Sequence, residues 1–201
     1  MLILFCAIIL SYLIGAIPTA FLAGKFIKGI DIRTIGSGNV GATNVYRSVG
    51  KFWGFVVLFV DIMKGVLPVL VIPYFLKVSE GVIRPDIYKI IIGMFAIIGH
   101  VWTVFLRFKG GKGVATTAGV LVVLAPKVVG IAFLIWVIVV SISRYVSVAS
   151  IIAAFSLPIT AWILGKPHEI TLFLMLLGAV GIYKHKANMA RLMKGKENKI
   201  F

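Results

Sequence analysis

Long apolar stretches, separated by short polar ones, occupy most of this sequence, and 61% of its 201 residues are hydrophobic. A helix needs about 20 apolar residues to cross the hydrocarbon core of a bilayer. Because an open sheet edge cannot be satisfied in lipid, stretches rich in β-branched residues are also expected to be helical. The candidate spans are 2–24, 53–76, 88–106, 114–126, 128–143, 147–165 and 170–183. The sequence therefore predicts an all-α, polytopic integral membrane protein with seven transmembrane helices, forming one domain over residues 1–201.

The charges predict how the chain is oriented in the membrane. Lys and Arg number 21 against 6 Asp and Glu, for a net charge of +15. With the N-terminus outside, the inner segments hold roughly three times as many cations as the outer ones, as cytoplasmic loops do. The C-terminus is then cytoplasmic. The first charged residue is Lys25, so residues 2–24 lack the basic segment of a cleavable signal and are expected to remain as an anchor.

The charge balance also bears on partners. Without a long soluble basic face, an anionic substrate or anionic lipid fits the excess of cations better than nucleic acid does. The single cysteine, Cys6, excludes an intrachain disulfide.

The first polar stretch is IGSGNVGATNVYR at 35–47. Gly36, Gly38 and Gly41 spell G-x-G-x-x-G, but the strand, helix and acid of a dinucleotide site are missing around it. A turn-rich linker is the plain interpretation. Glycines nevertheless let backbone N–H groups converge on an anion, and arginine offers a planar fork for phosphate. The predicted phosphate contacts in this stretch are Gly36, Ser37, Gly38, Asn39, Thr43, Asn44 and Arg47.

The second polar stretch is FKGGKG at 108–113, between two apolar segments. It does not match the P-loop pattern, and a basic cytoplasmic turn would explain Lys109 alone. Its glycines, Gly110, Gly111 and Gly113, permit close backbone approach to a ligand. A helix is expected from residue 114, and its first amides favour an anion. We predict that Lys112 contacts phosphate.

Two further polar stretches follow apolar spans. In RYVSVAS (144–150), Arg144 and Ser147 fit either a substrate contact or a snorkelling arginine with a helix-capping serine. In KHKAN (184–188), His185 and Asn188 are three residues apart on an expected helical continuation and would share a face. Lys184 precedes them. A histidine among lysines is also common on a solvated surface.

Asp61, Lys64 and His100 are ionisable residues in the interior of the predicted spans. Asp61 and Lys64 are three residues apart, so a structural salt bridge is the preferred interpretation and a transport role the alternative. His100 needs a hydrogen-bond partner in lipid and is expected to pack rather than to bind a ligand. No Cys, His, Asp and Glu cluster has metal-ligand spacing, and no serine nucleophile motif occurs, so neither a metal nor a covalent acyl-enzyme is predicted.

Four segments carry a family resemblance: GSGNVGATN (36–44), GH followed by FLRFKGGKGVAT (99–116), RYVS (144–147) and KHKAN (184–188). In this order they resemble the bacterial acyl-phosphate:glycerol-3-phosphate acyltransferase family, over nearly the whole chain. The sequence departs from the family pattern at Thr103, where proline is expected, and at Ala187, where an acid is expected.

The resemblance implies seven membrane helices and transfer of an acyl chain from acyl phosphate to the 1-hydroxyl of sn-glycerol 3-phosphate, at the inner face of the bacterial plasma membrane. The products are lysophosphatidic acid and phosphate. It implies catalytic or substrate-binding roles for Ser37, Asn39, Arg47, Lys112, Ser147, His185 and Asn188. We predict catalytic roles for Ser37, Arg47, Lys112, His185 and Asn188. The expected partners are the two substrates and membrane lipid, with no cofactor, nucleic acid or obligate protein partner.

Two alternatives remain from other classes. A transporter or channel for an organic phosphate anion would also use glycine, arginine and broken helices. Against it, the polar stretches fall on one side of the membrane and no hydropathy repeat is visible. A membrane scaffold with a basic inner face that recruits anionic lipid is the second alternative.

Overall fold

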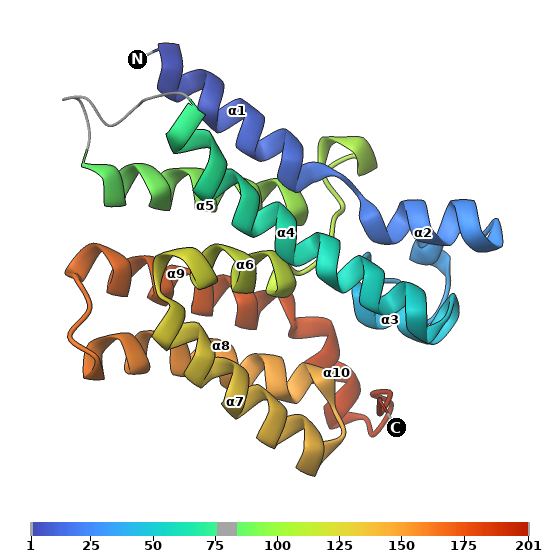
Figure 1. The fold of residues 1–201 in the computed structure, drawn as a ribbon. Coiled ribbons are helices and arrows are strands. Elements are labelled where there is room, and N and C mark those ends of the chain that lie inside the picture. The colour runs from blue at the N-terminus through green and yellow to red at the C-terminus, as the bar shows by residue number, and fades with distance from the viewer. Residues whose placement is uncertain (1, 76–83, 201) are drawn as a thin grey trace. The chain divides into compact units, whose positions relative to one another are not determined.

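The computed structural model describes residues 2–75 and 84–200, and these residues form helices and connecting segments without any strand (Figure 1). The all-α prediction is thus confirmed for the described residues. The chain divides into two compact units, Met1–Leu124 and Ala125–Phe201, which are described separately. The expected end of the second span at 76 and the expected outer cation Lys77 lie outside the described residues.

The first unit is built on long helices that cross with little space between their backbones. Its elements are α1 (Leu2–Ala16), α2 (Thr19–Lys28), the 3-10 turn η1 (Ile32–Thr34), α3 (Ala42–Ser48), α4 (Lys51–Phe75), α5 (Pro85–Val101), η2 (Val104–Leu106) and α6 (Val114–Leu124). α1 packs along α5, and α4 packs along α6. A Cβ at Gly15 would overlap the Ala96 backbone on α5, and one at Gly119 would overlap Ile62 on α4. Small residues therefore allow the close approach that drives helix association in lipid.

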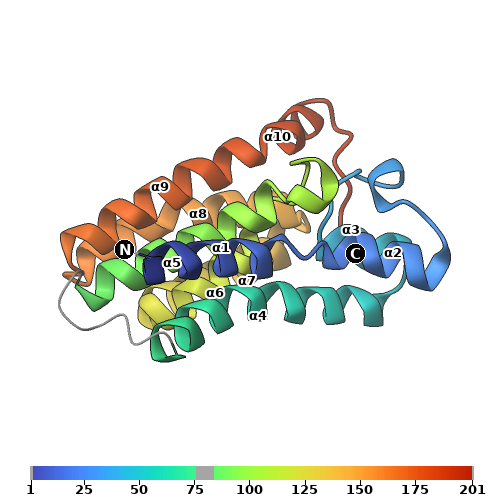
Figure 2. The same ribbon diagram turned by 90° about the horizontal axis from the view of Figure 1, so that it is seen from above.

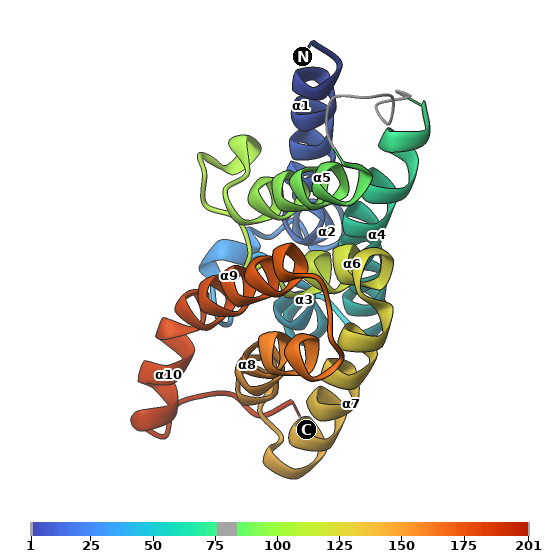
Figure 3. The ribbon, with the colours of Figure 1, turned by 90° about the vertical axis from the view of Figure 1, so that its left-hand side faces the viewer.

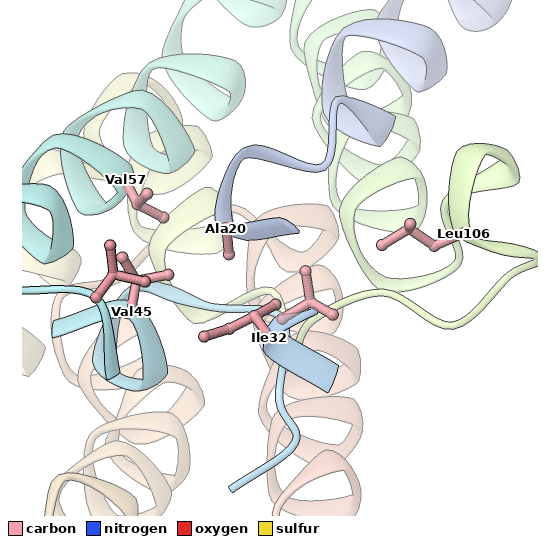
Figure 4. Close-up of a cluster of buried hydrophobic side chains, with 7 residues drawn as sticks. Ala20, Ile32, Val45, Val57 and Leu106 are labelled. Carbon is pink, nitrogen blue, oxygen red and sulfur yellow. The ribbon is translucent and has the colours of Figure 1, made fainter. Parts of the chain in front are cut away.

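A break after Ala16 divides the first predicted span into two helices. Proline at position 18 lacks an amide hydrogen, and α2 begins only at Thr19. The span predicted at 2–24 lies within the apolar segment Leu2–Lys28, which is broken at Pro18. α2 and α3 lie beside the N-terminal end of α4 (Figure 2). A cluster of buried side chains fills the space among these elements, including Ala20, Ile32, Val45, Val57 and Leu106 (Figure 4).

The second unit contains α7 (Pro126–Ser143), α8 (Val146–Ile163), α9 (His168–Lys184) and α10 (Lys186–Met193). α8 packs against both α7 and α9 (Figure 3). α9 and α10 meet at His185 with a bend of 48°. The helical continuation expected through the KHKAN segment is therefore present as α10, but the helix axis turns at the histidine.

Within residues 2–75 and 84–200, five helical segments are long and apolar enough to cross a membrane, or six if α9 and α10 form one bent span. They are Leu2–Lys28, Lys51–Phe75, Pro85–Leu106, Pro126–Ser143 and Val146–Ile163. The fourth predicted span corresponds to α6, which has only 11 residues. A multi-pass membrane architecture follows from the described helices, with fewer long spans than the seven predicted.

Candidate active site

The glycine-rich loop at 35–41, here called the first loop, is organised by the side chain of Asn44. Asn44 is 1% exposed. Its Nδ2 donates to the carbonyls of Ile32 (3.0 Å), Ile35 (3.0 Å) and Asn39 (3.1 Å). Its Oδ1 accepts from the Ser37 amide at 3.1 Å. Because every polar atom of this side chain is engaged with backbone, Asn44 shapes the first loop, and its predicted contact with substrate stays a prediction.

The backbone of the first loop is also hydrogen-bonded within the protein. The amides of Gly38 and Gly41 donate to the carbonyls of Ile35 and Asn39, and the Asn39 amide donates to Ser37 Oγ. These three amides therefore have partners within the loop, and the convergence of its N–H groups on an anion stays a prediction. Gly36 has a φ of +63°, and a Cβ there would overlap Asn44 Oδ1. Here glycine is required by the local fold.

α3 carries the remaining polar groups of this stretch. Thr43 and Arg47 are four residues apart, so they share one face of α3, and both are half-buried. Ser37 and Asn39 in the loop are half-buried as well, whereas Gly38 is exposed. These half-buried polar side chains remain the predicted ligand contacts of this stretch.

The segment 107–113, here called the second loop, folds tightly against the end of α5. The amides of Gly110 and Gly111 donate to the carbonyls of Val101 (3.2 Å) and His100 (3.1 Å). A Cβ at Gly111 would overlap the His100 ring and the Val40 carbonyl of the first loop. These glycines therefore serve close packing of the loop on α5, and the two loops are in direct contact at this point.

Positive backbone angles shape both ends of the second loop. Arg107 and Phe108 have φ values of 52° and 60°, and Gly113 has a φ of +83° immediately before α6. Lys109 is exposed and Lys112 is half-buried. The predicted helix start at residue 114 is confirmed, which places Lys112 two residues before the first residue of α6.

Thr103 stands where the family pattern led us to expect proline. It is 2% exposed, and its hydroxyl donates to the Ala16 carbonyl at 2.6 Å while accepting from the Phe105 amide at 3.3 Å. The threonine therefore provides a link between the end of α1 and the start of η2, which leads into the second loop, and a proline side chain cannot make this link.

Positive charge borders an open cavity of about 500 Å³ beside the second loop. Its lining residues are Phe21, Arg33, Phe105, Leu106, Arg107 and Lys109. Asp31 pairs with Arg33 at 2.6 Å, and this hydrogen-bonded arginine lowers the pKa of Asp31 to about 2. The arginine and lysine side chains together leave this cavity with an excess of positive charge.

In the second unit, a carboxylate gathers two of the predicted site residues. Glu197 Oε1 accepts from Ser147 Oγ (2.9 Å) and from Asn188 Nδ2 (2.6 Å). Its Oε2 accepts from Arg191 Nε at 2.7 Å. Tyr145, not Ser147, occupies the N-cap position of α8 and makes no capping hydrogen bond, so the capping interpretation of Ser147 is wrong. We call Ser147, Asn188, Arg191 and Glu197 the carboxylate cluster.

Burial raises the pKa of Glu197, but the hydrogen bonds from Asn188, Arg191 and Ser147 lower it more, so the pKa lies below its usual range. Neither Glu197 nor Arg191 is among the predicted site residues. A signal was present, because Glu197 is a single acid among the lysines at 194, 196 and 199. The tail that carries it is fixed again by the Ile200 amide, which donates to the Arg144 carbonyl at 2.8 Å.

The His185 ring is 3% exposed and sits at the bend between α9 and α10. Its Nδ1 lies 2.8 Å from the Gly181 carbonyl. Because a carbonyl only accepts, this contact favours the tautomer with hydrogen on Nδ1, and Nε2 then carries the lone pair. The neighbouring Lys184 is half-buried and Arg144 is exposed.

Among the described residues, no group of three or more His, Cys, Asp and Glu side chains is arranged to hold a metal ion. The predicted site residues fall into two groups, one in each unit of the chain. Ser37, Asn39, Thr43, Arg47 and Lys112 lie in or next to the touching loops of the first unit, and Ser147 and Asn188 share Glu197 in the second.

Comparison with known proteins adds three findings. The family model described as glycerol-3-phosphate acyltransferase matches residues 5–195. The glycerol-3-phosphate acyltransferase of Desulforudis audaxviator is 45% identical over 190 residues, which is 94% of this chain and 92% of the relative. Glycerol-3-phosphate acyltransferase 2 of Moorella thermoacetica is 45% identical over 194 residues, covering 96% of both chains.

Two crystal structures of PlsY (YgiH), an integral membrane glycerol 3-phosphate acyltransferase, resemble the fold. The glycerol 3-phosphate form has a TM-score of 0.84 at 36% identity, and the lysophosphatidic acid form has 0.83 at 37%. Each match covers 98% of this chain and 94% of the other. With sequence and fold matched over almost their full lengths, the chain belongs to the glycerol-3-phosphate acyltransferase family of multi-pass membrane enzymes.

Proposed function

We propose that the protein transfers an acyl chain from acyl phosphate to the 1-hydroxyl of sn-glycerol 3-phosphate, forming lysophosphatidic acid and phosphate. The observation that carries this proposal is the match over 98% of the chain to an acyltransferase structure in its glycerol 3-phosphate form. The acyl phosphate donor is inferred from the four motifs of the sequence. The same family match argues against the transporter and scaffold alternatives.

The enzyme is proposed to be a single domain that crosses the bacterial plasma membrane seven times, with its N-terminus outside and its C-terminus in the cytoplasm. The excess of cations on the inner segments supports this orientation. α6 would supply the short additional span, since 11 residues rise only roughly 16 Å as a helix. All four polar stretches then face the cytoplasm, where glycerol 3-phosphate is dissolved.

Two phosphate-bearing substrates repel each other, so the site must neutralise them before they react. Arg47 is proposed to bind phosphate through its planar fork, and Lys112 to bind the second phosphate as a compact charge. Lys109, Arg144 and Lys184 are proposed to contribute further positive charge to substrate binding. Ser37, Asn39, Thr43 and Ser147 provide neutral hydrogen bonds, while the loop glycines and Asn44 hold the backbone that carries these groups.

The transfer is proposed to occur in one step without an acyl-enzyme. The glycerol oxygen attacks the acyl carbonyl carbon and forms the ester bond. The bond from that carbon to the phosphate oxygen breaks, and phosphate leaves with the bonding electrons, stabilised by Lys112. Ser37 and Asn188 are the side chains proposed to stabilise the developing oxyanion. Because acyl phosphate is already activated, orientation supplies up to about 7–11 kcal/mol of the barrier reduction.

The hydroxyl proton goes either to His185 Nε2 or to a phosphate oxygen of a substrate. With hydrogen on Nδ1, Nε2 is the basic ring atom, so His185 is suited to either proton transfer or orientation of the hydroxyl. A pH–rate profile of His185→Ala separates these roles. Loss of an inflection present in the parent supports the base role, whereas an unchanged profile with a modest drop in rate supports proton transfer to phosphate.

The central test uses the purified protein in lipid nanodiscs with acyl phosphate and labelled glycerol 3-phosphate. Product formed without an ion gradient supports the enzyme, and a faster reaction with acyl phosphate than with acyl thioesters supports the proposed donor. No product from either donor, with gradient-dependent phosphate uptake in liposomes, would favour a transporter instead.

Arg47→Ala and Lys112→Ala are each expected to lower kcat/KM by at least about 100-fold while leaving thermal unfolding unchanged. Arg47→Lys should also lose most activity because an ammonium lacks the fork, whereas a lipid-recruiting scaffold would tolerate it. Lys127→Ala removes an exposed lysine outside the polar stretches and serves as the matched control, with activity like the parent.

A further inference from the structure

A buried ion pair lies on α4, inside one of the apolar spans. Lys64 Nζ is 2.8 Å from Asp61 Oδ1, and the two side chains are 4% and 2% exposed. The sequence-based prediction of a salt bridge at this spacing is confirmed. Two apolar side chains would be easier to bury than two charges, so stability alone is a weak reason for the pair. Intramembrane charges more often serve a functional site.

The pair is bonded to the break between α1 and α2. Lys64 Nζ donates to the Ile17 carbonyl at 2.7 Å, and the Thr19 hydroxyl donates to Asp61 Oδ1. The last carbonyls of a helix have no partner within the helix, and Pro18 brings no amide hydrogen to the break. Asp61 and Lys64 therefore determine how α1 ends and where α2 begins.

That geometry extends to the first loop. α2 packs against η1 and α3, which flank residues 35–41 on either side. Any shift of Thr19 moves α2, and with it the two elements that hold the ends of the first loop.

The pair also faces the second loop. His100 Nδ1 lies 3.9 Å from Asp61 Oδ1. The His100 carbonyl accepts the Gly111 amide, and its ring lies against Gly111. A cavity of about 10 Å³ lies between Lys64 and the two loops, and its lining includes Thr19, Lys64, His100, Val40 and Gly111. Groups from the pair and from both loops thus surround one small space.

We propose that Asp61 and Lys64 are positioning residues that hold the two loops in a fixed position relative to each other. They act on the first loop through Thr19 and α2, and on the second loop through His100. The pair touches no substrate. It fixes the relative placement of the Arg47-bearing and Lys112-bearing segments, and so it acts on phosphate binding. This inference rests on the proposed function for its kinetic readout only.

The test replaces both charges with apolar side chains of similar volume in Asp61→Leu/Lys64→Met. Removing the pair as a unit leaves no uncompensated buried charge, so the double variant should fold and unfold thermally close to the parent. We expect amide hydrogen exchange to accelerate in residues 35–41 and also in 108–113. The KM for glycerol 3-phosphate should rise so that kcat/KM falls by about 100-fold, the effect of a displacement near 1 Å.

Two single variants, one of them a control, test the connection from Asp61 to the first loop by itself. Thr19→Val removes the hydroxyl contact with Asp61 and should accelerate exchange in residues 35–41 but not in 108–113. Ser11→Ala is the control, because the buried Ser11 hydroxyl also links two helices, donating to the Ile92 carbonyl at 2.6 Å, but away from both loops. It should change neither exchange in the loops nor the KM.

Parent-like exchange in either loop of the folded double variant would overturn the proposal, as would a kcat/KM within threefold of the parent. Should the double variant fail to fold, the Thr19→Val exchange pattern decides alone, and equal effects on both loops would overturn it. If the parent transfers no acyl chain, the proposed function fails. The exchange measurements still test whether Asp61 and Lys64 hold the two loops.

Discussion

Asn44 and Glu197 each gather the polar groups of one part of the molecule, and they do so with opposite chemistry. The Asn44 amide is neutral and mainly donates, with three backbone carbonyls around Nδ2. The Glu197 carboxylate is charged and only accepts, from Ser147, Asn188 and Arg191. The shape of the first loop is therefore independent of ionisation, whereas the carboxylate cluster requires Glu197 to be deprotonated.

Asn44→Asp should produce the largest loss of stability, because it removes the donor that the three carbonyls require and brings a negative charge beside them. Each buried acceptor left without a donor costs about 1–3 kcal/mol, so we expect the free energy of unfolding to fall by about 3 kcal/mol or more. Thermal unfolding in detergent measures this. Asn44→Ala removes the donor without adding charge and should lose less. A parent-like stability of Asn44→Asp would mean that Asn44 is not the hub of the first loop.

The reciprocal exchange, Glu197→Gln, should be milder. Glutamine keeps one oxygen for Ser147 and Asn188 but turns an amide toward Arg191, and hydrogen bonds to charged groups contribute about 1.5–3 kcal/mol. We expect a loss of stability in that range, together with reduced kcat, because a neutral amide oxygen accepts more weakly than a carboxylate and holds Asn188 less firmly. Glu169→Gln makes the same chemical change in the first turn of α9 and should cost less than about 1 kcal/mol. Equal losses of stability in Glu197→Gln and Glu169→Gln would contradict a structural role for the carboxylate cluster.

The difference in stability between the parent and Glu197→Gln should disappear at acidic pH. Hydrogen bonds from Asn188, Arg191 and Ser147 hold the folded pKa of Glu197 below its usual range, despite the opposing effect of burial. A group with a depressed folded pKa contributes stability that is complete above its ordinary pKa and is lost as pH falls through the folded value. The two unfolding curves should thus differ at pH 7 and converge at acidic pH. Asp31, with its pKa near 2, is present in both proteins and cancels from the comparison.

The sequence predicted those features that depend on spacing along the chain. Asp61 and Lys64 pair because they are one helical turn apart, and the helix expected after Gly113 begins at Val114. The helix break at Pro18 had a visible signal, but the apolar run through residue 24 outweighed it. The bend at His185 had none, because nothing in the KHKAN segment marks a change of helix axis.

Contacts between distant residues could not be predicted in this way. Ser147 and Glu197 are 50 positions apart, and their hydrogen bond depends on the path of the C-terminal tail. The role of the glycines could not be predicted for a different reason. The freedom that would allow Gly111 to approach a ligand also allows it to approach His100, and only the fold decides which contact is made.

Thr103→Pro should have the smallest effect of these variants. Thr103 is a second neutral hub, and losing its hydrogen bond to Ala16 should cost about 1 kcal/mol, as Thr103→Val would measure. Its φ of −68° already suits proline, which restricts the unfolded chain and returns about 0.4–1 kcal/mol. The expected order of thermal stability is parent, Thr103→Pro and then Thr103→Val. Proline also restricts the residue before it, here Trp102, whose ψ is 61°. If Thr103→Pro is less stable than Thr103→Val, this restriction outweighs the gain. Threonine would then be needed at position 103 for its backbone conformation as well as for its hydrogen bond.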